Sequence, residues 1–200
     1  MEALQILVVS VVFVGVVAGN ELVTMRTHYP AAVSRKVSHV LCALIVCIAA
    51  QFMSFRLFAI VGAIFLPIMI RFRYRELRSL ADRSESSIGE VLFPVGVALA
   101  ALLPIERKEF VVCVLLMGLS DTAAYAAGKW LKRPTLLFGK TLPGTAAFFL
   151  SALAICLAAG MPKTHAAAVA AVGAAVEHFG PYGTDNATVP PLAGLVILLL

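Results

Sequence analysis

Long apolar stretches alternate with short polar segments along the whole chain. Within each stretch the apolar residues run continuously, which is typical of membrane helices and not of barrel strands. A bilayer core of about 30 Å is crossed by about 20 helical residues, or by fewer where the bilayer thins. The pattern therefore predicts an all-α integral membrane protein, a polytopic bundle of about 7–8 transmembrane helices. The stretches are 3–19, 37–53, 55–70, 88–104, 110–127, 144–160, 165–179 and 189–200.

Two ends of this pattern need a separate interpretation. The eighth stretch covers about 18 Å at the helical rise, so it cannot span a bilayer alone. The first stretch has the length of a signal peptide, but Glu2 stands where a basic residue is expected. We therefore expect an uncleaved first helix. Three local signals predict helix starts: a capping-box pattern that begins at Ser87, a proline suited to a first helical turn at Pro143, and a capping residue at Thr164.

Composition agrees with a membrane protein. Of the 200 residues, 61% are hydrophobic and 14% are charged, whereas a soluble domain is roughly half apolar and a quarter charged. The four cysteines lie inside apolar stretches without metal-ligand spacing, so we interpret them as small core residues. The sequence shows no internal repeat or linker, which favours one transmembrane domain over residues 1–200.

The basic residues predict an orientation. Of the 16 Lys and Arg residues, twelve fall in the segments 20–36, 71–87 and 128–143. Cytoplasmic loops are enriched in Lys and Arg, so these segments are expected in the cytoplasm and the N-terminus outside. This distribution also accounts for the net charge of +5, and we expect membrane lipids rather than nucleic acid as partners.

Asp121 is the polar residue that most needs an explanation. It lies in the fifth apolar stretch, well before Lys129 and Trp130, which mark the membrane interface. A carboxylate in lipid is costly unless it is paired, bound to a metal or exposed to water. Helical spacing places Asp121, Tyr125 and Gly128 on one face. A structural hydrogen bond to a neighbouring helix is the simpler alternative to a functional site.

The segment "GKWLKRPTLLFGKTLPGT", residues 128–145, combines cations with glycines and prolines. It is not a P-loop, because the first glycine of that motif is missing and no strand precedes it. It can still bind phosphate, since a helix N-terminus and glycine backbone favour anions. An ordinary basic loop is the alternative. The candidate nucleotide-binding residues are Lys129, Lys132, Arg133, Gly139, Lys140, Thr141, Gly144 and Thr145.

Two further polar groups fall on the same expected side. Glu177, Asp185 and Asn186 offer hard oxygen ligands of the kind that Mg²⁺ prefers, although Asp185 or Asn186 could instead cap the last helix. Arg35, Lys36 and His39 enter the second helix, where they could bind phosphate or anchor the helix at the interface. The basic and aromatic segment "RFRYRELR", residues 71–78, is more typical of an anchor to anionic lipid. Together these groups indicate nucleotide chemistry on a membrane lipid.

The order of these motifs resembles the polyprenol kinase family, which includes dolichol kinase, phytol kinase and CTP-dependent diacylglycerol kinase. The resemblance covers about residues 34–190 and is most specific between residues 118 and 190. The matching segments are R-K-x-x-H at 35–39, S-D-T-A-A…G-K at 120–129, G-K-T…G-T-x-A-F-F at 139–149 and E…D-N at 177–186. The departures are Ser120, where the family commonly has Gly, and Pro143, where it has Glu.

The resemblance implies a kinase that uses CTP and Mg²⁺ to phosphorylate a lipid alcohol. It implies catalytic roles for Asp121, Glu177 and Lys140, metal binding by Asp121, Asp185 and Asn186, and contacts of Arg35, Lys36 and His39 with substrate or phosphate. Pro143 keeps open a cytidylyltransferase that acts on a lipid phosphate, and Asp121 alone would also suit a small transporter. The sequence leaves open which lipid alcohol is used and the oligomeric state.

Overall fold

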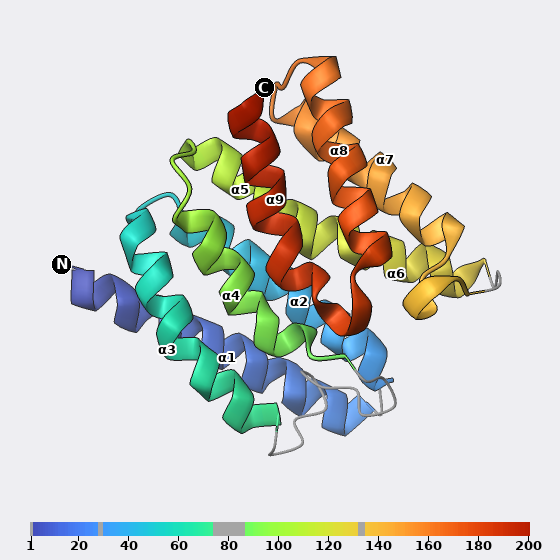
Figure 1. Ribbon diagram of the computed structural model, residues 1–200. Coiled ribbons are helices and arrows are strands. Elements are labelled where there is room, and N and C mark those ends of the chain that lie inside the picture. The colour runs from blue at the N-terminus through green and yellow to red at the C-terminus, as the bar shows by residue number, and fades with distance from the viewer. Residues whose placement is uncertain (1, 28–29, 74–86, 132–134) are drawn as a thin grey trace.

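The computed structural model describes residues 2–27, 30–73, 87–131 and 135–200, and its regular structure there is entirely helical (Figure 1). Each predicted apolar stretch lies largely within a helix, so the all-helical class is confirmed. The α-helices are α1 (Glu2–Thr27), α2 (Ala31–Ala49), α3 (Phe55–Arg73), α4 (Gly89–Ala101), α5 (Arg107–Leu115), α6 (Asp121–Trp130), α7 (Leu142–Ala158), α8 (Lys163–Phe179) and α9 (Asp185–Leu199).

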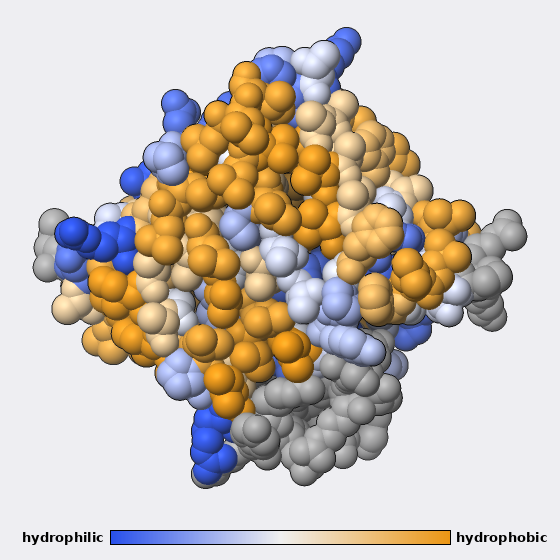
Figure 2. All heavy atoms as spheres, viewed as in Figure 1, coloured by the Kyte–Doolittle hydropathy of each residue, from blue (hydrophilic) through white to orange (hydrophobic). Residues whose placement is uncertain are grey.

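Three helices are long and apolar enough to cross a membrane. They are α1, α2 and the continuous helix Arg107–Trp130, which joins α5 to α6 through a π-helical turn. The helices α4, α7 and α9 are apolar but shorter. Large hydrophobic side chains such as Val11 and Ile48 point outward. Figure 2 shows apolar residues over much of one face, with a paler, more polar band from the centre toward the lower right and the most hydrophilic residues at the margins. This surface fits a lipid environment.

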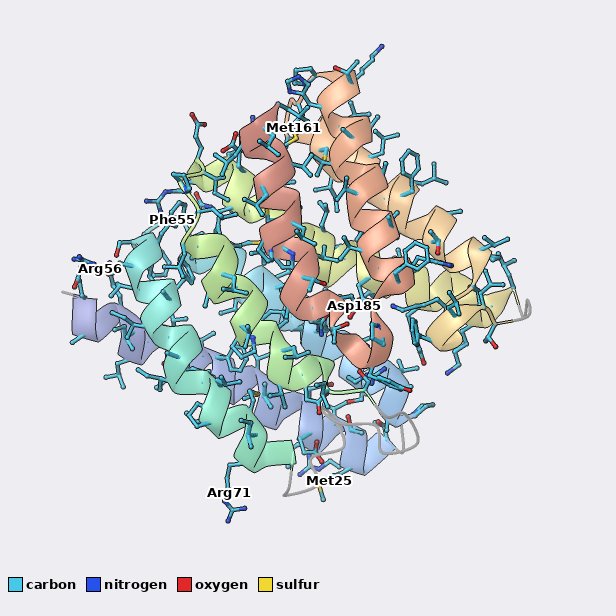
Figure 3. The ribbon with its side chains drawn as sticks, in the orientation of Figure 1. Met25, Phe55, Arg56, Arg71, Met161 and Asp185 are labelled. Atoms are coloured by element: carbon cyan, nitrogen blue, oxygen red, sulfur yellow. The ribbon has the colours of Figure 1, made fainter. Side chains whose placement is uncertain are left out.

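The helix ends gather on two opposite sides of the bundle (Figure 1). The start of α1, the α2–α3 and α4–α5 turns, the α7–α8 turn and the end of α9 lie toward the upper left and top. The end of α1, the start of α2 and the α8–α9 connection lie toward the lower right. Arg56 and Arg71 mark the two ends of α3, and Arg71 points away from the bundle (Figure 3). Long basic side chains at helix ends commonly reach toward a membrane interface.

The core is built mainly from residues with side chains that are fully buried between helices. Phe110 of α5 and Phe148 of α7 are among the largest of these. Close approach of helices depends on small residues. At Gly96 of α4, an added Cβ atom would lie 1.9 Å from the carbonyl oxygen of Asn186 on α9. This contact brings the start of α9, with Asp185, against α4.

The local signals for helix starts have mixed outcomes. Pro143 lies in the first turn of α7, as predicted, and Thr141 caps that helix by accepting a hydrogen bond of 3.1 Å from the Gly144 amide. The prediction for Thr164 is wrong, because α8 begins at Lys163. Near Ser87 a helix does begin, since α4 starts at Gly89, but the predicted capping box is wrong. The N-cap residue is Ile88, which has no side-chain cap.

We predict that Gly96→Ala lowers the thermal unfolding midpoint of the detergent-purified protein. The added methyl group must displace the backbone of α9, and overpacking of this kind costs about 1–3 kcal/mol. Gly15→Ala on α1 is the matched control, because no atom lies within 4 Å of its added Cβ and alanine favours a helix over glycine by about 1 kcal/mol. Equal midpoints for the two variants would contradict the close contact of α4 and α9.

Candidate active site

Asp121 is positioned by an irregular turn within a long helix. The π-helical turn Leu116–Ser120 directly precedes it, and the Asp121 amide donates to the carbonyl of Leu116, five residues back. Carbonyl groups of this turn take side-chain partners: His39 Nε2 lies 3.1 Å from the Met117 oxygen, and Thr122 Oγ1 donates to Gly118 at 2.7 Å. Single π turns of this kind are frequent at functional sites. Here the turn sets the angle at which Asp121 meets α2.

The N-terminal half of α2 divides its polar residues between two neighbours. Asn20 Nδ2 on α1 donates to Ser34 Oγ at 3.1 Å and to Ser38 Oγ at 2.7 Å. These serines are four residues apart and therefore share one helix face. Lys36 and His39 turn instead to α6, where their Nζ and Nε2 atoms lie 2.5 Å and 3.7 Å from Asp121 Oδ2. The hydrogen bonds to the serines thus fix the rotation of α2 about its axis, and this rotation directs Lys36 toward Asp121.

Lys140 joins the loop before α7 to both remaining carboxylates. Its Nζ atom donates to Glu177 Oε1 at 2.6 Å and to Asp185 Oδ2 at 2.7 Å. Glu177 lies near the end of α8 and Asp185 begins α9. One ammonium group therefore holds together three segments that are far apart in the sequence.

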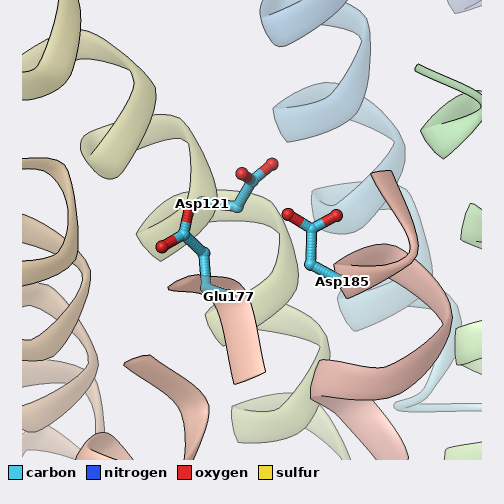
Figure 4. Close-up of side chains that lie close together, drawn as sticks. All are labelled: Asp121, Glu177 and Asp185. Carbon is cyan, nitrogen blue, oxygen red and sulfur yellow. The ribbon is translucent and has the colours of Figure 1, made fainter. Parts of the chain in front are cut away.

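Three carboxylates converge from α6, α8 and α9, as Figure 4 shows. Asp121, Glu177 and Asp185 each offer an oxygen within 4.8 Å of the others, and all three residues are buried. Glu177 Oε2 has no hydrogen-bond partner among the residues that the structure describes. Buried carboxylate oxygens with unused acceptor capacity are the ligands that a hard divalent cation requires. The donor set therefore fits Mg²⁺.

The cluster is nearly balanced in charge. The side chains of Glu177 and Asp185 are only 4% and 6% exposed, and isolated charges so deeply buried would be costly. Burial alone would lower the pKa of Lys140, but the carboxylates of Asp185, Asp121 and Glu177 outweigh burial and raise the pKa above its ordinary value. Lys140 is therefore a cation at neutral pH.

One cavity of about 950 Å³ contains the whole cluster. Its charged part is lined by the three carboxylates of the cluster together with Glu90, Arg35, Lys36, Lys129 and Lys140. It continues between α1 and α2 on one side and α3 and α4 on the other, where the lining is apolar and includes Phe13, Val46, Phe65 and Val97. The cavity thus joins a charged region to a hydrocarbon-lined region without a break.

The structure brings most of the predicted site residues to this cavity. Lys129, Gly139, Thr141 and Gly144 line it with the cluster. Thr145 directly follows Gly144 but is not among the residues that line the cavity, and it bonds to His178 Nδ1 at 2.7 Å. Asn186 lines the cavity but its Nδ2 donates to the Gly89 carbonyl at 2.8 Å, which ties α9 to the start of α4. Lys132 and Arg133 lie outside the described residues.

Several residues of the site were not assigned from the sequence. Tyr125 lies beneath two cations, with Lys36 Nζ and Lys129 Nζ each 5.4 Å from its ring centroid. His178 follows Glu177 directly and fixes Thr145, and Asn20 orients α2 through its serines. The helical spacing of Tyr125 from Asp121 was a usable signal for a shared face. The roles of Asn20 and His178 depend on contacts between distant segments, which no local pattern indicates.

In comparisons with known proteins, no protein family, no curated protein and no solved structure matches the chain. The assignment of function therefore depends on the site itself.

We predict that Lys36→Met destabilises the protein strongly, by about 3–5 kcal/mol, because it leaves the Asp121 carboxylate buried without its closest cation. The double variant Lys36→Met/Asp121→Asn should recover much of this loss, because the unpaired charge is removed. Chemical unfolding in detergent measures both. Lys163→Met, on an exposed lysine at the start of α8, is the control and should change the stability little. An equally small change for Lys36→Met would contradict a structural role for the ion pair.

Proposed function

We propose that this protein is a membrane-embedded kinase that transfers the γ-phosphoryl group of CTP to the hydroxyl of a lipid alcohol. The observation that carries the proposal is the single cavity in which three buried carboxylates meet an apolar region. Such a cavity suits a substrate with a polar reacting group and a hydrocarbon tail. The preference for CTP comes from the resemblance to polyprenol kinases.

The proposal includes a multi-pass topology of about 7–8 membrane-spanning helices with the N-terminus outside. It is supported by the basic residues, which concentrate in alternate connections. It is also supported by the two opposite sides at which the helix ends gather (Figure 1). The site would then open toward the cytoplasm, where nucleotides are available.

In this proposal the loop before α7 receives the triphosphate. Lys140 supplies positive charge, and the positive end of the α7 helix dipole, at Leu142–Gly144, favours an anion. At Gly144, an added Cβ would lie 2.9 Å from the Ala124 carbonyl oxygen, so glycine allows this helix start to pack against α6. Lysine at position 129 and Arg35 extend the positive lining of the same cavity.

Asp121, Asp185 and Glu177 are the residues that would hold Mg²⁺, with Asn186 beside them. When bound, the ion neutralises phosphate charge that develops during phosphoryl transfer. Lys36 and His39 hold Asp121 in place from α2. Lys140 must release at least one carboxylate oxygen when it turns to the phosphates, since it now contacts Glu177 and Asp185 together.

The proposed reaction is an in-line displacement at phosphorus. The alcohol oxygen forms a bond to the γ-phosphorus, and the bond from that phosphorus to the β,γ-bridging oxygen breaks. CDP leaves with the bonding electron pair, and Glu177 accepts the proton of the hydroxyl group through the carboxylate oxygen that does not hold the ion. The apolar region holds the lipid tail, which orients the hydroxyl toward the carboxylates.

We predict that Asp121→Asn lowers phosphoryl transfer at least about 100-fold, because positioned charge supplies most of the catalysis in this reaction class. The purified protein is given Mg²⁺, a panel of lipid alcohols and phosphatidate, with CTP labelled at either the γ- or the α-phosphate. Label from the γ position should enter an alcohol, and removal of Mg²⁺ should abolish it. Glu2→Gln, distant in sequence and exposed, is the control.

The same assay decides against the proposal in two ways. Transfer of α-label to phosphatidate would identify a cytidylyltransferase instead. Undiminished transfer of the γ-phosphoryl group by Asp121→Asn would show that the reaction does not need the Asp121 carboxylate.

We predict that Val46→Phe raises the KM for the lipid alcohol and leaves CTP binding unchanged, because the phenyl ring is larger than the valine side chain and fills part of the apolar region. Val46 lines the cavity and is buried. Ile48→Phe is the matched control on the same helix, since Ile48 is 65% exposed on the outer surface. Steady-state kinetics with each substrate varied in turn measure the effect. Equal KM values for the alcohol in the two variants would contradict tail binding between α1–α2 and α3–α4.

A further inference from the structure

Two turns of the same construction stand at the charged end of the cavity. In Leu137–Lys140 the Lys140 amide donates to the Leu137 carbonyl at 3.1 Å, and in Pro181–Thr184 the Thr184 amide donates to the Pro181 carbonyl at 3.0 Å. The central residues have positive φ in both turns, 56° and 78° for Phe138 and Gly139, and 52° and 87° for Tyr182 and Gly183. These values and bonds define type I′ turns.

The aromatic residues occupy unfavourable positions in these turns. Type I′ turns strongly prefer Asn-Gly or Gly-Gly, because the first central residue must adopt the left-handed conformation. A bulky residue there is strained by about 1–3 kcal/mol. Phe138 and Tyr182 are the non-glycine residues with positive φ in the described part of the chain. Strain of this kind is typical of functional positions, and here it occurs twice in equivalent places.

The two rings meet edge to face among the residues that line the cavity. Their centroids are 6.3 Å apart with planes inclined at 60°, and both residues line the cavity. Phe138 and Tyr182 are 52% and 60% exposed, so about half of each residue is available to a ligand. Each ring precedes a charged group of the cluster along the chain: Lys140 is two residues after Phe138, and Asp185 is three residues after Tyr182.

The backbone of both turns is held in place. Leu136 donates its amide to the Lys140 carbonyl at 2.6 Å, which closes the first turn a second time. The Tyr182 carbonyl accepts a 2.8 Å bond from the Ile88 amide, which attaches the second turn to the start of α4. The rings are therefore presented from fixed supports, and such preorganisation lowers the cost of binding a planar ligand.

We propose that Phe138 and Tyr182 form the binding site for the nucleobase of the nucleotide, with the base stacked on the exposed face of one ring and in contact with the other, and with the phosphates directed inward to Lys140. This inference rests on the proposed function, because it assumes that a nucleotide is the donor. An aromatic ring stacks on every base through its π-face. The site therefore contributes affinity for a nucleoside triphosphate over inorganic tripolyphosphate and tolerates different bases.

The test uses Phe138→Asn and Tyr182→Asn in the full-length protein in lipid nanodiscs. Asparagine suits the left-handed position, so both variants keep the turn and lose only the ring, and their thermal midpoints should equal or exceed that of the wild type. Calorimetry with Mg²⁺ then gives Kd for CTP and for tripolyphosphate. We expect Kd for CTP to rise roughly 5- to 100-fold in each variant, with Kd for tripolyphosphate unchanged.

Two controls sharpen the result. Tyr182→Phe keeps the ring and should retain the affinity for CTP. Phe52→Asn removes an exposed ring at the α2–α3 turn, at the other end of α2, and should leave both Kd values unchanged.

The outcomes separate this inference from the proposed function. Unchanged CTP affinity in both asparagine variants, with γ-phosphoryl transfer intact, overturns the nucleobase site and leaves the kinase proposal standing. Loss of CTP affinity in the variants of a protein that transfers no phosphoryl group supports the site and overturns the kinase. Absence of binding by CTP and tripolyphosphate alike overturns both. Weakened binding of lipid alcohol without a change for CTP would identify the rings as membrane contacts and overturn the inference.

Discussion

The bridge from Lys140 to Glu177 and Asp185 is the interaction on which the site depends. Two carboxylates beside a third, Asp121, would repel one another in a buried space, and each would lack solvation. Lys140 shares its one positive charge between Glu177 and Asp185, and Lys36 pairs with Asp121, so the three carboxylates and two lysines carry one net negative charge. Because the cations come from α2 and from the loop before α7, charge balance requires four helices and a loop to meet at one place.

This requirement explains irregular features that would otherwise weaken the fold. The π turn before Asp121 gives up regular hydrogen bonding in the middle of a membrane-length helix, yet its carbonyls are satisfied by His39 and Thr122. Unsatisfied backbone groups are expensive away from water, so these partners are necessary. The hydrogen bonds from Asn20 to the serines of α2 also support the site, although they lie outside it, because they hold the helix that carries Lys36 and His39.

Much of the fold was predictable from the sequence, because continuous apolar stretches and helix propensity are local properties. The grouping of Asp121 with Glu177 and Asp185 was also predictable, since buried charge in an apolar chain demands a common explanation. The bridging role of Lys140 was not, because pairing across 45 residues depends on how helices pack. The two type I′ turns were not predictable for another reason. Phe-Gly and Tyr-Gly are poor type I′ sequences, so local propensity disfavours the conformation that they adopt. The start of α8 at Lys163 rather than after Thr164 shows the usual uncertainty of helix boundaries.

In the proposed kinase, the same charge balance would constrain how a substrate enters. A divalent ion at the three carboxylates would compete with the ammonium of Lys140 for Glu177 and Asp185, because both cations need the same oxygens. A cation that arrives without phosphates would leave an excess of positive charge in a buried space, which is unfavourable. A metal ion that arrives with a triphosphate brings the compensating negative charge, and Lys140 gains a new partner as it loses a carboxylate. In the proposed kinase, the cluster would therefore favour joint entry of metal and nucleotide over entry of either alone.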